Sequence, residues 1–560
     1  MNKTCRQCAA PFTVGQDDLA MLSKLSPQIG GNVYQLPAPA LCPDCRLQRR
    51  LAWRNERALY FRNCDSTGNR ILSIFAPDGP YKVFHHEAWY GDGWNALDCG
   101  RPFDFSRPFF DQFMDLMEAV PLLALNIISV QNCEYVNECG WSKNCYLTIE
   151  ADQNEDSMYG YRVFFVKNCV DCTEVVRSQQ CYECMDCENC FNLRWSQLCK
   201  QCSDSSFLFD CRGCANCFGC AGLRQKKHCL FNAQLTEEKF KFHMKTFDPC
   251  NPSHLKAALE QFEKIKFSVP RKAFVGEQND NVSGGYIFQS KNAHDCFNIR
   301  GCRDCRYVDY IRDSRDCMDY FVWGDKAEQV YEAESCGHNV QNIRFCCTCL
   351  ENVHDLLYCY LCALGTNNCL GCVGLKRQKH CILNRQYAKE EYEALVPKII
   401  KHMQNSGEWG EFYPVNNSPF AYNETTAQDY FPMTQEQATA LQWRWKEKLP
   451  SHAGTGKVEP VPHGDIANIS DDVTKKIFAC EATGKSFRVT VQELRFYRDN
   501  RLPLPRFHPD ERHKRRMTMR NPRKLWDRTC ATCRTKIRTS YAPERPEKIL
   551  CEECYLKEVY

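Results

Sequence analysis

Cysteine pairs near both ends of the chain have the spacing of metal ligands. Two CxxC pairs lie near the start of the sequence and two lie near its end. Each pair of such turns can bring four sulfurs to one point at tetrahedral spacing, which is typical of a structural zinc ribbon. The predicted zinc ligands are Cys5, Cys8, Cys42 and Cys45 in one quartet, and Cys530, Cys533, Cys551 and Cys554 in the other.

The two ends also resemble each other beyond these cysteines. Cys5, Phe12 and Leu19 recur as Cys480, Phe487 and Leu494, and Cys64 recurs as Cys530. We therefore predict one duplicated module with two four-ligand positions, of which each copy has kept one. In the first copy, the incomplete position consists of Cys64, Thr67, His85 and Ala88. In the second copy, it consists of Cys480, Thr483, His508 and Glu511.

The incomplete position of the second copy has two interpretations. Cys480, His508 and Glu511 are all legitimate zinc ligands, and three protein ligands would leave an open coordination position of the catalytic type. The other interpretation is a spare site that has lost its ligands. The residues alone favour the second.

Basic residues follow the CxxC turn of each module. Residues 505–548 contain 14 Lys or Arg and 5 Asp or Glu. Such a patch beside a zinc knuckle, with Trp53 and Trp526 close by, could bind phosphates and stack on bases. The alternatives are a solvated helix face, or arginines that pair with the acidic middle of the chain. The candidate nucleic-acid contacts are Arg49, Arg50, Arg54, Arg57, Arg515, Arg516, Arg523 and Lys524.

The middle of the chain contains a ladder of cysteines. All 16 cysteines from Cys133 to Cys229 lie a multiple of three residues apart, and several, such as Cys181 and Cys199, are 18 apart. Stacked columns of this kind predict a β-solenoid with coils of about 18 residues. Asn or Asp precedes half of these cysteines, and both tolerate the left-handed backbone of a tight corner. Each third residue would then point inward.

The chemistry of the ladder is left open by its pattern. The cysteines could form a packed thiol interior, bind metal at some positions, or form disulfides or iron–sulfur sites. The motif C-x2-C-x7-H-C occurs twice, 152 residues apart, and its histidines are either metal ligands or turn residues. The candidate ligands are Cys181, Cys184, Cys199 and Cys202, with Cys217, Cys220, His228 and Cys229 in the first motif and Cys369, Cys372, His380 and Cys381 in the second.

These features predict a mainly β protein with some helices. Helical periodicity after each ladder predicts helices that cap the open ends of the solenoids. The expected order is a zinc-ribbon module (1–98), a helical connector (99–131), a Cys-rich solenoid repeat (132–235), a helical connector (236–273), a second solenoid repeat (274–387), a helix with an aromatic extended segment (388–448), a linker (449–465) and a second zinc-ribbon module (466–560).

Composition restricts the location and the class of function. The chain has 41 cysteines in 560 residues and a formal net charge of +3. The best apolar run, 120–130, is shorter than the roughly 20 residues of a membrane span, and no export signal is visible. We therefore expect a cytoplasmic protein with reduced thiols and no membrane contact. No phosphate-binding loop, dinucleotide motif or nucleophile elbow is found, so an enzyme is less expected than a binding protein and no small-molecule substrate is evident.

The sequence resembles a known but uncharacterised protein family. The resemblance is carried by CPDCR-x2-RR-x3-RNER, FDFSRPFF, the NC-x-DC ladder and SPFAYNET-x2-QDYFP, and it covers nearly the whole chain. The family is that of the multi-CxxC proteins of candidate-phyla bacteria, and it implies zinc-ribbon ends around a Cys-rich middle. Its members sometimes have a CoA-transferase label, which nothing in these residues supports.

Three functions remain as hypotheses. The first is a non-enzymatic zinc scaffold, bound to RNA or DNA through its arginines or to a protein along the solenoid. The second is metal storage or buffering by the ladder cysteines. The third is a zinc-dependent hydrolase or a redox enzyme that uses the incomplete Cys/His/Glu site.

Overall fold

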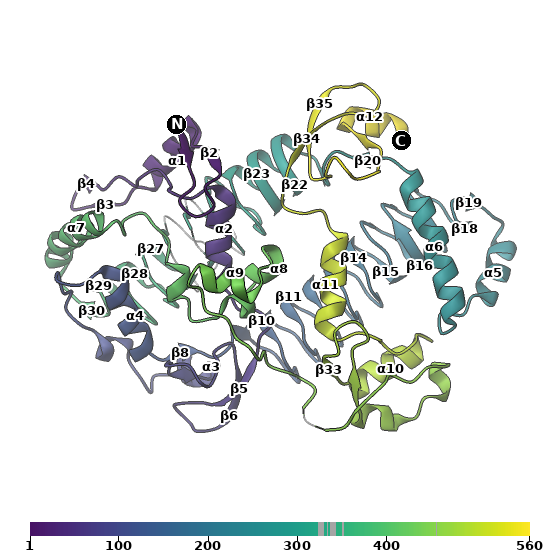
Figure 1. Cartoon of the computed structure of the whole chain (residues 1–560), viewed down its shortest axis with the longest axis horizontal. Coiled ribbons are helices and arrows are strands. Elements are labelled where there is room, and N and C mark those ends of the chain that lie inside the picture. Colours follow the sequence, from purple (N-terminus) through teal and green to yellow (C-terminus); the bar gives the residue numbers. More distant parts are fainter. Residues whose placement is uncertain are drawn as a thin grey trace.

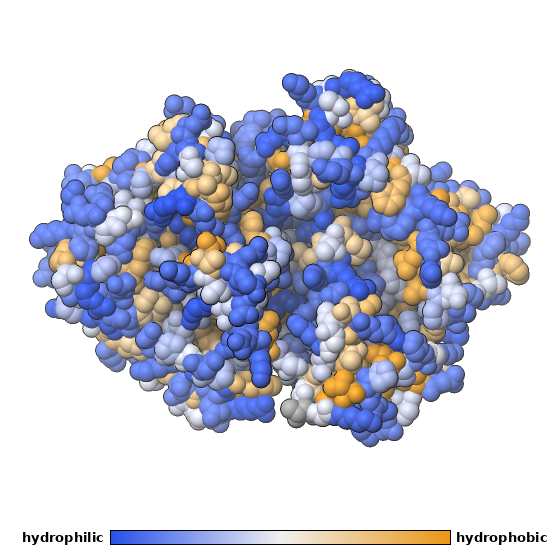
Figure 2. All heavy atoms as spheres, viewed as in Figure 1, coloured by the Kyte–Doolittle hydropathy of each residue, from blue (hydrophilic) through white to orange (hydrophobic). Residues whose placement is uncertain are grey.

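The computed structural model describes residues 1–559 except 323–326, 328–329, 333, 337–342, 346, 350–351 and 455. The predicted second repeat contains most of these exceptions and the predicted linker contains residue 455, so those parts lie outside the described residues. Two stacks of short strands form the two halves of the molecule in Figure 1, and Figure 2 shows mostly hydrophilic residues on this face. Many strands and 12 α-helices are described, which confirms the expected mixture.

The first stack, residues 127–234, is built from parallel strands. Within each of its two sheets, neighbouring parallel strands pair at a step of 12, as in Ile149 with Tyr161 and Tyr161 with Thr173. Single bridges such as Gln179 with Phe191 continue the same step between the two sheets. The strands are β9 (Ile127–Ile128), β10 (Asn137–Gly140), β11 (Ile149–Asp152), β12 (Tyr161–Phe164), β13 (Thr173–Val176), β14 (Met185–Glu188), β15 (Phe191–Arg194), β16 (Ser203–Phe209), β17 (Phe218–Ala221) and β18 (Cys229–Leu230), with β19 (Ala233–Gln234) antiparallel at the end.

This shorter step corrects the expected coil length. Cysteines such as Cys181 and Cys199 are one and a half steps apart, so their spacing does not join neighbouring strands. Both the observed and the expected lengths are multiples of three, and cysteines occur at inward positions that recur every third residue. The spacing of cysteines along the chain therefore could not distinguish the two lengths.

Left-handed corners allow every third residue to face inward. The expected left-handed backbone before the ladder cysteines is confirmed at all eight Asn or Asp positions, for example Asn168 (φ 52°) and Asp171 (φ 55°). Less tolerant residues such as Tyr159 and Arg162 adopt it as well, both at φ 55°. The inward positions are filled by cysteine and small or aliphatic residues, which are buried together in one cluster.

The second stack, residues 276–386, has an irregular step. The step is 12 from Lys291 to Arg303, whereas it is 13 from His354 to Asn367 and 11 from Asp280 to Lys291. Single added or missing residues, rather than long loops, break the cysteine register in these strands. They are β21 (Gly276–Glu277), β22 (Asp280–Phe288), β23 (Lys291–Arg300), β24 (Arg303–Arg306), β25 (Glu334–Cys336), β26 (Cys347–Cys349), β27 (His354–Leu357), β28 (Asn367–Leu370), β29 (Lys379–Ile382) and β30 (Arg385–Gln386).

Helices pack against the last strands of both stacks. The helix α6 (Pro252–Ser268) lies on β17, and its Phe262 is buried among aromatic side chains of the first stack. The helix α7 (Lys389–Ser406) lies on β29 of the second stack. Side-chain caps at Thr236 and Asn251 begin α5 (Glu237–Thr246) and α6. None of the described helices combines the length and the apolar sequence needed to span a membrane.

Each end of the chain packs against the stack that is further from it in sequence. The N-terminal segment shares a hydrophobic cluster with the second stack, and the C-terminal segment shares one with the outer side chains of the first. In Figure 1, α2 lies beside the second stack and α11 lies across the first. The chain therefore closes on itself at both ends.

Both ends contain a hairpin, two helices and a second hairpin in that order, and the N-terminal end has an additional short hairpin (28–33) between its two helices. The N-terminal segment contains β1 (Asn2–Thr4), β2 (Pro11–Thr13), α1 (Gln16–Leu25), β3 (Gln28–Ile29), β4 (Asn32–Val33), α2 (Pro43–Leu51), β5 (Tyr60–Asn63), β6 (Arg70–Ser73), β7 (Val83–Phe84), α3 (His86–Tyr90), α4 (Phe109–Ala119) and β8 (Leu122–Leu123). The segment that follows α7 and the C-terminal segment contain α8 (Ala427–Tyr430), α9 (Gln435–Ala440), β31 (Val458–Glu459), β32 (Ile477–Ala479), β33 (Ser486–Phe487), α10 (Val491–Asp499), α11 (Pro509–Met519), β34 (Trp526–Thr529), β35 (Lys536–Thr539), β36 (Ile549–Leu550) and α12 (Glu552–Val559).

Candidate metal centres

The first predicted quartet converges on one point. Cys5 and Cys8 lie in the turn of the β1–β2 hairpin, while Cys42 and Cys45 lie at the start of α2. The four sulfurs are within 4.8 Å of one another, and Cys8 Sγ is 3.7 Å from Cys42 Sγ. The hydrogen bond that Cys42 Sγ accepts from Cys45 lowers the pKa of Cys42 to about 5, and the backbone N–H of Cys42 donates to Cys5 Sγ. Thiolates stabilised in this way are the form that binds metal.

The second predicted quartet has the same geometry at the other end. Cys530, Cys533, Cys551 and Cys554 also lie within 4.8 Å of one another. The Cys533 and Cys551 sulfurs are 3.7 Å apart, and the backbone N–H of Cys551 donates to Cys530 Sγ over 3.3 Å. Burial opposes ionisation of Cys530, but these backbone donors lower its pKa to about 6. Both quartets could therefore hold a metal ion.

The incomplete position of the second module does not form a three-ligand centre. Among the described residues, only the two quartets bring three or more ligand atoms within 4.8 Å of one another. His508 Nδ1 instead accepts a hydrogen bond from the backbone N–H of Asp510 and caps α11, and Glu511 pairs with Arg515 at 2.9 Å. Burial lowers the pKa of His508 to about 4. The imidazole is thus used for helix capping. Cys480, His508 and Glu511 are not brought together as a three-ligand group in the described structure, as the favoured interpretation of a spare site expects.

The ladder cysteines are hydrogen-bonded thiols. Cys184 Sγ donates to the carbonyl oxygens of Tyr182 and Leu193, at 3.5 and 3.4 Å, which are two residues before it and nine after it. The described cysteines are free thiols. Among the described residues, the candidate ladder positions do not bring three ligand atoms within 4.8 Å of one another. The same pattern, with one or both carbonyls, holds for Cys181, Cys199, Cys202, Cys217, Cys220, Cys229, Cys369, Cys372 and Cys381.

The two motif histidines point away from the cysteines beside them. His228 and His380 both have left-handed backbone, at φ 55°, so their side chains face outward while the next residue faces inward. The ring of His228 packs against Phe240, and the ring of His380 packs against Tyr392 of α7. They are the turn residues of the second interpretation, and the predicted Cys/His metal sites are not assembled.

The arginines of α2 are buried against the second stack. Arg46 Nε lies 2.8 Å from Asp319 Oδ2, and Arg50 Nη1 lies 3.2 Å from Asp319 Oδ1. The two arginines are four residues apart, so they share one helix face. We call this set the Asp319 clamp. Arg49 contacts both carboxylate oxygens of Glu332, at 2.8 and 2.7 Å.

The arginines of α11 form an equivalent set on the first stack. Arg512 and Arg516, also four residues apart, both pair with Asp171, and the Arg516 Nη1 distance is 2.7 Å. Arg512 also lies 3.3 Å from Glu493 Oε1. We call Arg512, Arg516 and Asp171 the Asp171 clamp. Asp171 and Asp319 are both fully buried, so each clamp neutralises an aspartate that would otherwise be a buried charge.

These contacts correct the predicted nucleic-acid surface. The alternative prediction is that these arginines pair with acidic residues of the middle of the chain. That is what the structure shows for four of them, whose guanidinium groups are buried against carboxylates and cannot meet phosphates: Arg49, Arg50, Arg516 and Arg523. Arg54 is buried as well and pairs with Glu56 and Glu150. The remaining candidates are at least partly exposed: Arg57 pairs with Asp510 at 3.1 Å, Arg515 pairs with Glu511, and Lys524 lies over the ring of Trp526.

The two clamp aspartates were not singled out from the sequence. Each occupies a left-handed corner, with φ 55° at Asp171 and 53° at Asp319, where Asp is common for backbone reasons alone. The available signal was the opposite charge of the acidic ladder and the basic end segments. That signal indicated pairing without indicating the partners.

No family model matches the chain, and no curated protein matches it. The two cysteine quartets and the two arginine clamps are therefore the observations from which a function must be argued.

Proposed function

We propose that the chain is a zinc-stabilised, non-enzymatic scaffold in which two β-solenoid halves are joined by zinc-ribbon ends. Zinc is the metal that closed four-cysteine sites typically hold, and such sites are structural. One observation carries the proposal: the ligands Cys42 and Cys45 lie at the start of the helix that buries Arg46 and Arg50 against Asp319. Metal binding would therefore order the helix that attaches the N-terminal segment to the second stack.

The β-solenoid part of the proposal is supported by the parallel pairing and by the corners. A constant step of 12 in the first stack, with left-handed backbone at every third residue, is the pattern of a coil with four short sides. Substitution at one corner tests this. We expect Asn168→Val, which places a β-branched residue at φ 52°, to lower the free energy of unfolding by about 1–2 kcal/mol, with Asn168→Gly close to wild type. Equal stability of the two variants would contradict a left-handed corner.

The ladder supports a packed interior more than metal storage. A storage protein needs many thiolates that can gather around ions, whereas the ladder sulfurs donate hydrogen bonds to main-chain carbonyls inside a buried cluster. Buried thiols of this kind behave as small apolar groups. Free thiols in this number suit a reducing compartment, so we propose a cytoplasmic location.

Elemental analysis combined with thiol titration of the native protein tests the scaffold against storage. We expect two tightly bound zinc ions per chain, one in each quartet of the structure. Cys45→Ser should remove one ion, and Cys184→Ala, a matched ladder control, should remove none. A zinc content far above two that falls with each ladder substitution would support storage. A further ion lost on replacing Cys480 would revive the open-site enzyme hypothesis.

A further inference from the structure

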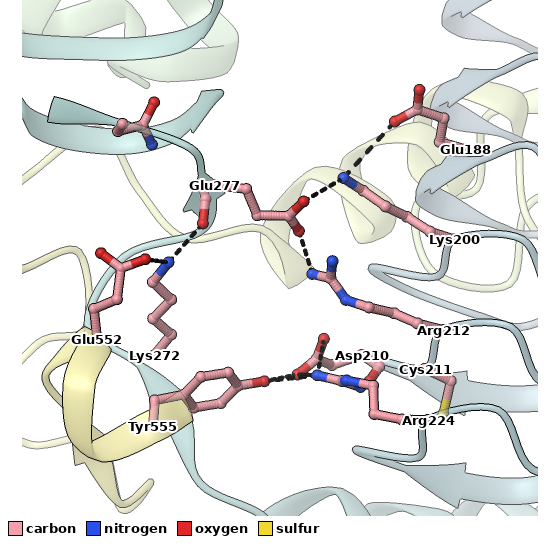
Figure 3. A network of polar contacts seen from close by, with 12 residues as sticks. Glu188, Lys200, Asp210, Cys211, Arg212, Arg224, Lys272, Glu277, Glu552 and Tyr555 are labelled. Carbon is pink, nitrogen blue, oxygen red and sulfur yellow. Dashed lines mark hydrogen bonds and ion pairs between the residues drawn. The ribbon is translucent and has the colours of Figure 1, made fainter. Parts of the chain in front are cut away.

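A cavity of about 170 Å³ is lined by residues of the two strand stacks and of the C-terminal ribbon. The first stack contributes Lys200 and Arg212, and the second stack contributes Glu277. Arg271 comes from the short segment before the second stack, and the ribbon contributes Tyr541 and Tyr555. Figure 3 shows how several of these groups converge from the two stacks and from α12.

The side chains around this cavity do not balance in charge. Seven Lys or Arg residues and five Asp or Glu residues line it, so the wall has an excess of two positive charges. The carboxylates are already engaged. Glu277 lies 3.2 Å from Lys200 and also pairs with Arg212, as Figure 3 shows. Glu188 lies 3.2 Å from Arg300. Asp210 accepts contacts from Arg224 and Tyr555.

Arg271 is the cation that this network leaves without a carboxylate. It is 4% exposed, and its guanidinium donates only to the carbonyl oxygens of Val269 and Lys266, at 3.0 and 2.6 Å, while it lies 4.1 Å from the centre of the Phe209 ring. No carboxylate of the described residues lies within 4.0 Å of it, and burial lowers the pKa of Arg271. Its position is fixed by its backbone, because β20 (Arg271–Lys272) pairs with β36 of the ribbon.

A buried cation of this kind is stabilised by an anion. A planar guanidinium binds tetrahedral oxyanions through paired hydrogen bonds. Lys200 and Arg300 also line the cavity, and each lies 4.9 Å from the centre of the Phe288 ring. A water molecule occupies about 30 Å³, so the cavity has room for one small oxyanion with a few waters, and it is smaller than the roughly 300 Å³ of a site for a nucleotide-sized ligand. We propose that this cavity is a binding site for a small oxyanion of the phosphate or sulfate class, with Arg271 as its principal contact.

Calorimetric titration of the full zinc-loaded chain with inorganic phosphate in chloride buffer tests the proposal. We expect saturable binding of one phosphate per chain with a Kd of about 1 mM or lower. Arg271→Met should weaken binding by about tenfold or more, because the buried fork is removed. Arg303→Met removes an exposed arginine of β24 that does not line the cavity, and it should leave the Kd unchanged.

A second variant keeps the test decisive if Arg271→Met does not fold. Arg300 is 38% exposed, so Arg300→Met should fold, and we expect it to weaken phosphate binding by about threefold. Titration with glucose 6-phosphate tests whether the site takes a free anion or the phosphoryl group of a larger ligand. Glucose 6-phosphate should bind at least tenfold more weakly than phosphate, because the cavity is too small for the sugar. Absence of saturable phosphate and sulfate binding to the wild-type chain, or an unchanged Kd in both cavity variants, would overturn the proposal.

Discussion

The helices α2 and α11 each place two arginines, four residues apart, beside a buried aspartate, but the two helices begin in different ways. The first turn of α2 holds Cys42 and Cys45 of the first quartet. The first turn of α11 has His508 as its cap, without a complete ligand set. The comparison teaches that a helix start can be fixed either by a cysteine quartet or by a capping side chain. In both cases the helix then places two arginines beside a buried aspartate.

The second quartet has another task. It lies beyond α11, in the ribbon formed by β34–β36 and α12. That ribbon is attached by the pairing of β36 with β20 and by several side-chain contacts. Lys272 Nζ lies 2.5 Å from Glu552, and Tyr555 donates to Asp210. We infer that the first metal attaches a whole segment and that the second holds a smaller ribbon in place.

Removing one ligand from either quartet should have the largest effect on stability and should distinguish the roles of the two quartets most clearly. Structural zinc contributes about 10 kcal/mol of apparent folding free energy in small zinc domains. We expect Cys45→Ser to lose one zinc and to expose the backbone of α2 to hydrogen exchange, while α11 stays protected. Cys554→Ser should lose the other zinc and expose the ribbon only. Loss of protection in α11 of Cys45→Ser would contradict independent attachment.

Neutralising the clamp aspartates should come next in size. Asp319→Asn and Asp171→Asn each leave two buried arginines without their shared carboxylate, which typically costs about 3–5 kcal/mol. The loss should be somewhat smaller at Asp171, because Arg512 keeps its contact with Glu493.

Chemical denaturation measures both losses. The matched control is Asp316→Asn, which removes a partly exposed pair with Lys24 and should cost under about 1 kcal/mol. If either clamp variant behaved like this control, the arginines would not depend on that aspartate.

The capping imidazole should make the attachment of α11 sensitive to acid. Burial lowers the pKa of His508 to about 4, against 6.5 for a free imidazole, so the unfolded chain binds the proton first as pH falls. Stability from the neutral form is fully present above pH 6.5 and is lost as the pH falls to about 4, by up to about 3 kcal/mol.

The variant His508→Asn isolates this term, since Asn can cap the helix without titrating. Hydrogen exchange of α11 from pH 7 to pH 5 should show acid opening in the wild type and a smaller change in the variant. Parallel pH profiles would show that another group is responsible. The quartet at α2 would instead release its metal as its thiolates are protonated.

The smallest change in the free energy of unfolding is expected at the exposed face of α11. Arg515 is half exposed and pairs with Glu511 one helical turn away. Arg515→Ala should change the free energy of unfolding by only about 0.3–0.5 kcal/mol. Its neighbour Arg516 is buried in the Asp171 clamp, so Arg516→Ala should cost several times more. Thermal or chemical unfolding of the pair of variants measures the contrast.

Much of the local structure was predictable from the sequence because it depends on neighbouring residues. The quartets follow from CxxC spacing, and the corners follow from the tolerance of Asn and Asp for left-handed backbone, which all eight positions before the ladder cysteines adopt. The repeat length was not predictable from cysteines that recur every third residue, since 12 and 18 satisfy that rule equally. The pairing of neighbouring strands in the structure was needed to choose between the two lengths.

The sequence by itself determined which residues can bind metal, which ones turn the chain and which ones must be buried, because these are properties of side chains and short spacings. Only the tertiary structure decided which ligands converge and where the arginines go. It turned His508 into a helix cap, and it buried Arg50 and Arg516 against aspartates that are 269 and 345 positions away along the chain. Such pairings depend on how distant segments dock, and charge along the chain indicates only that partners exist.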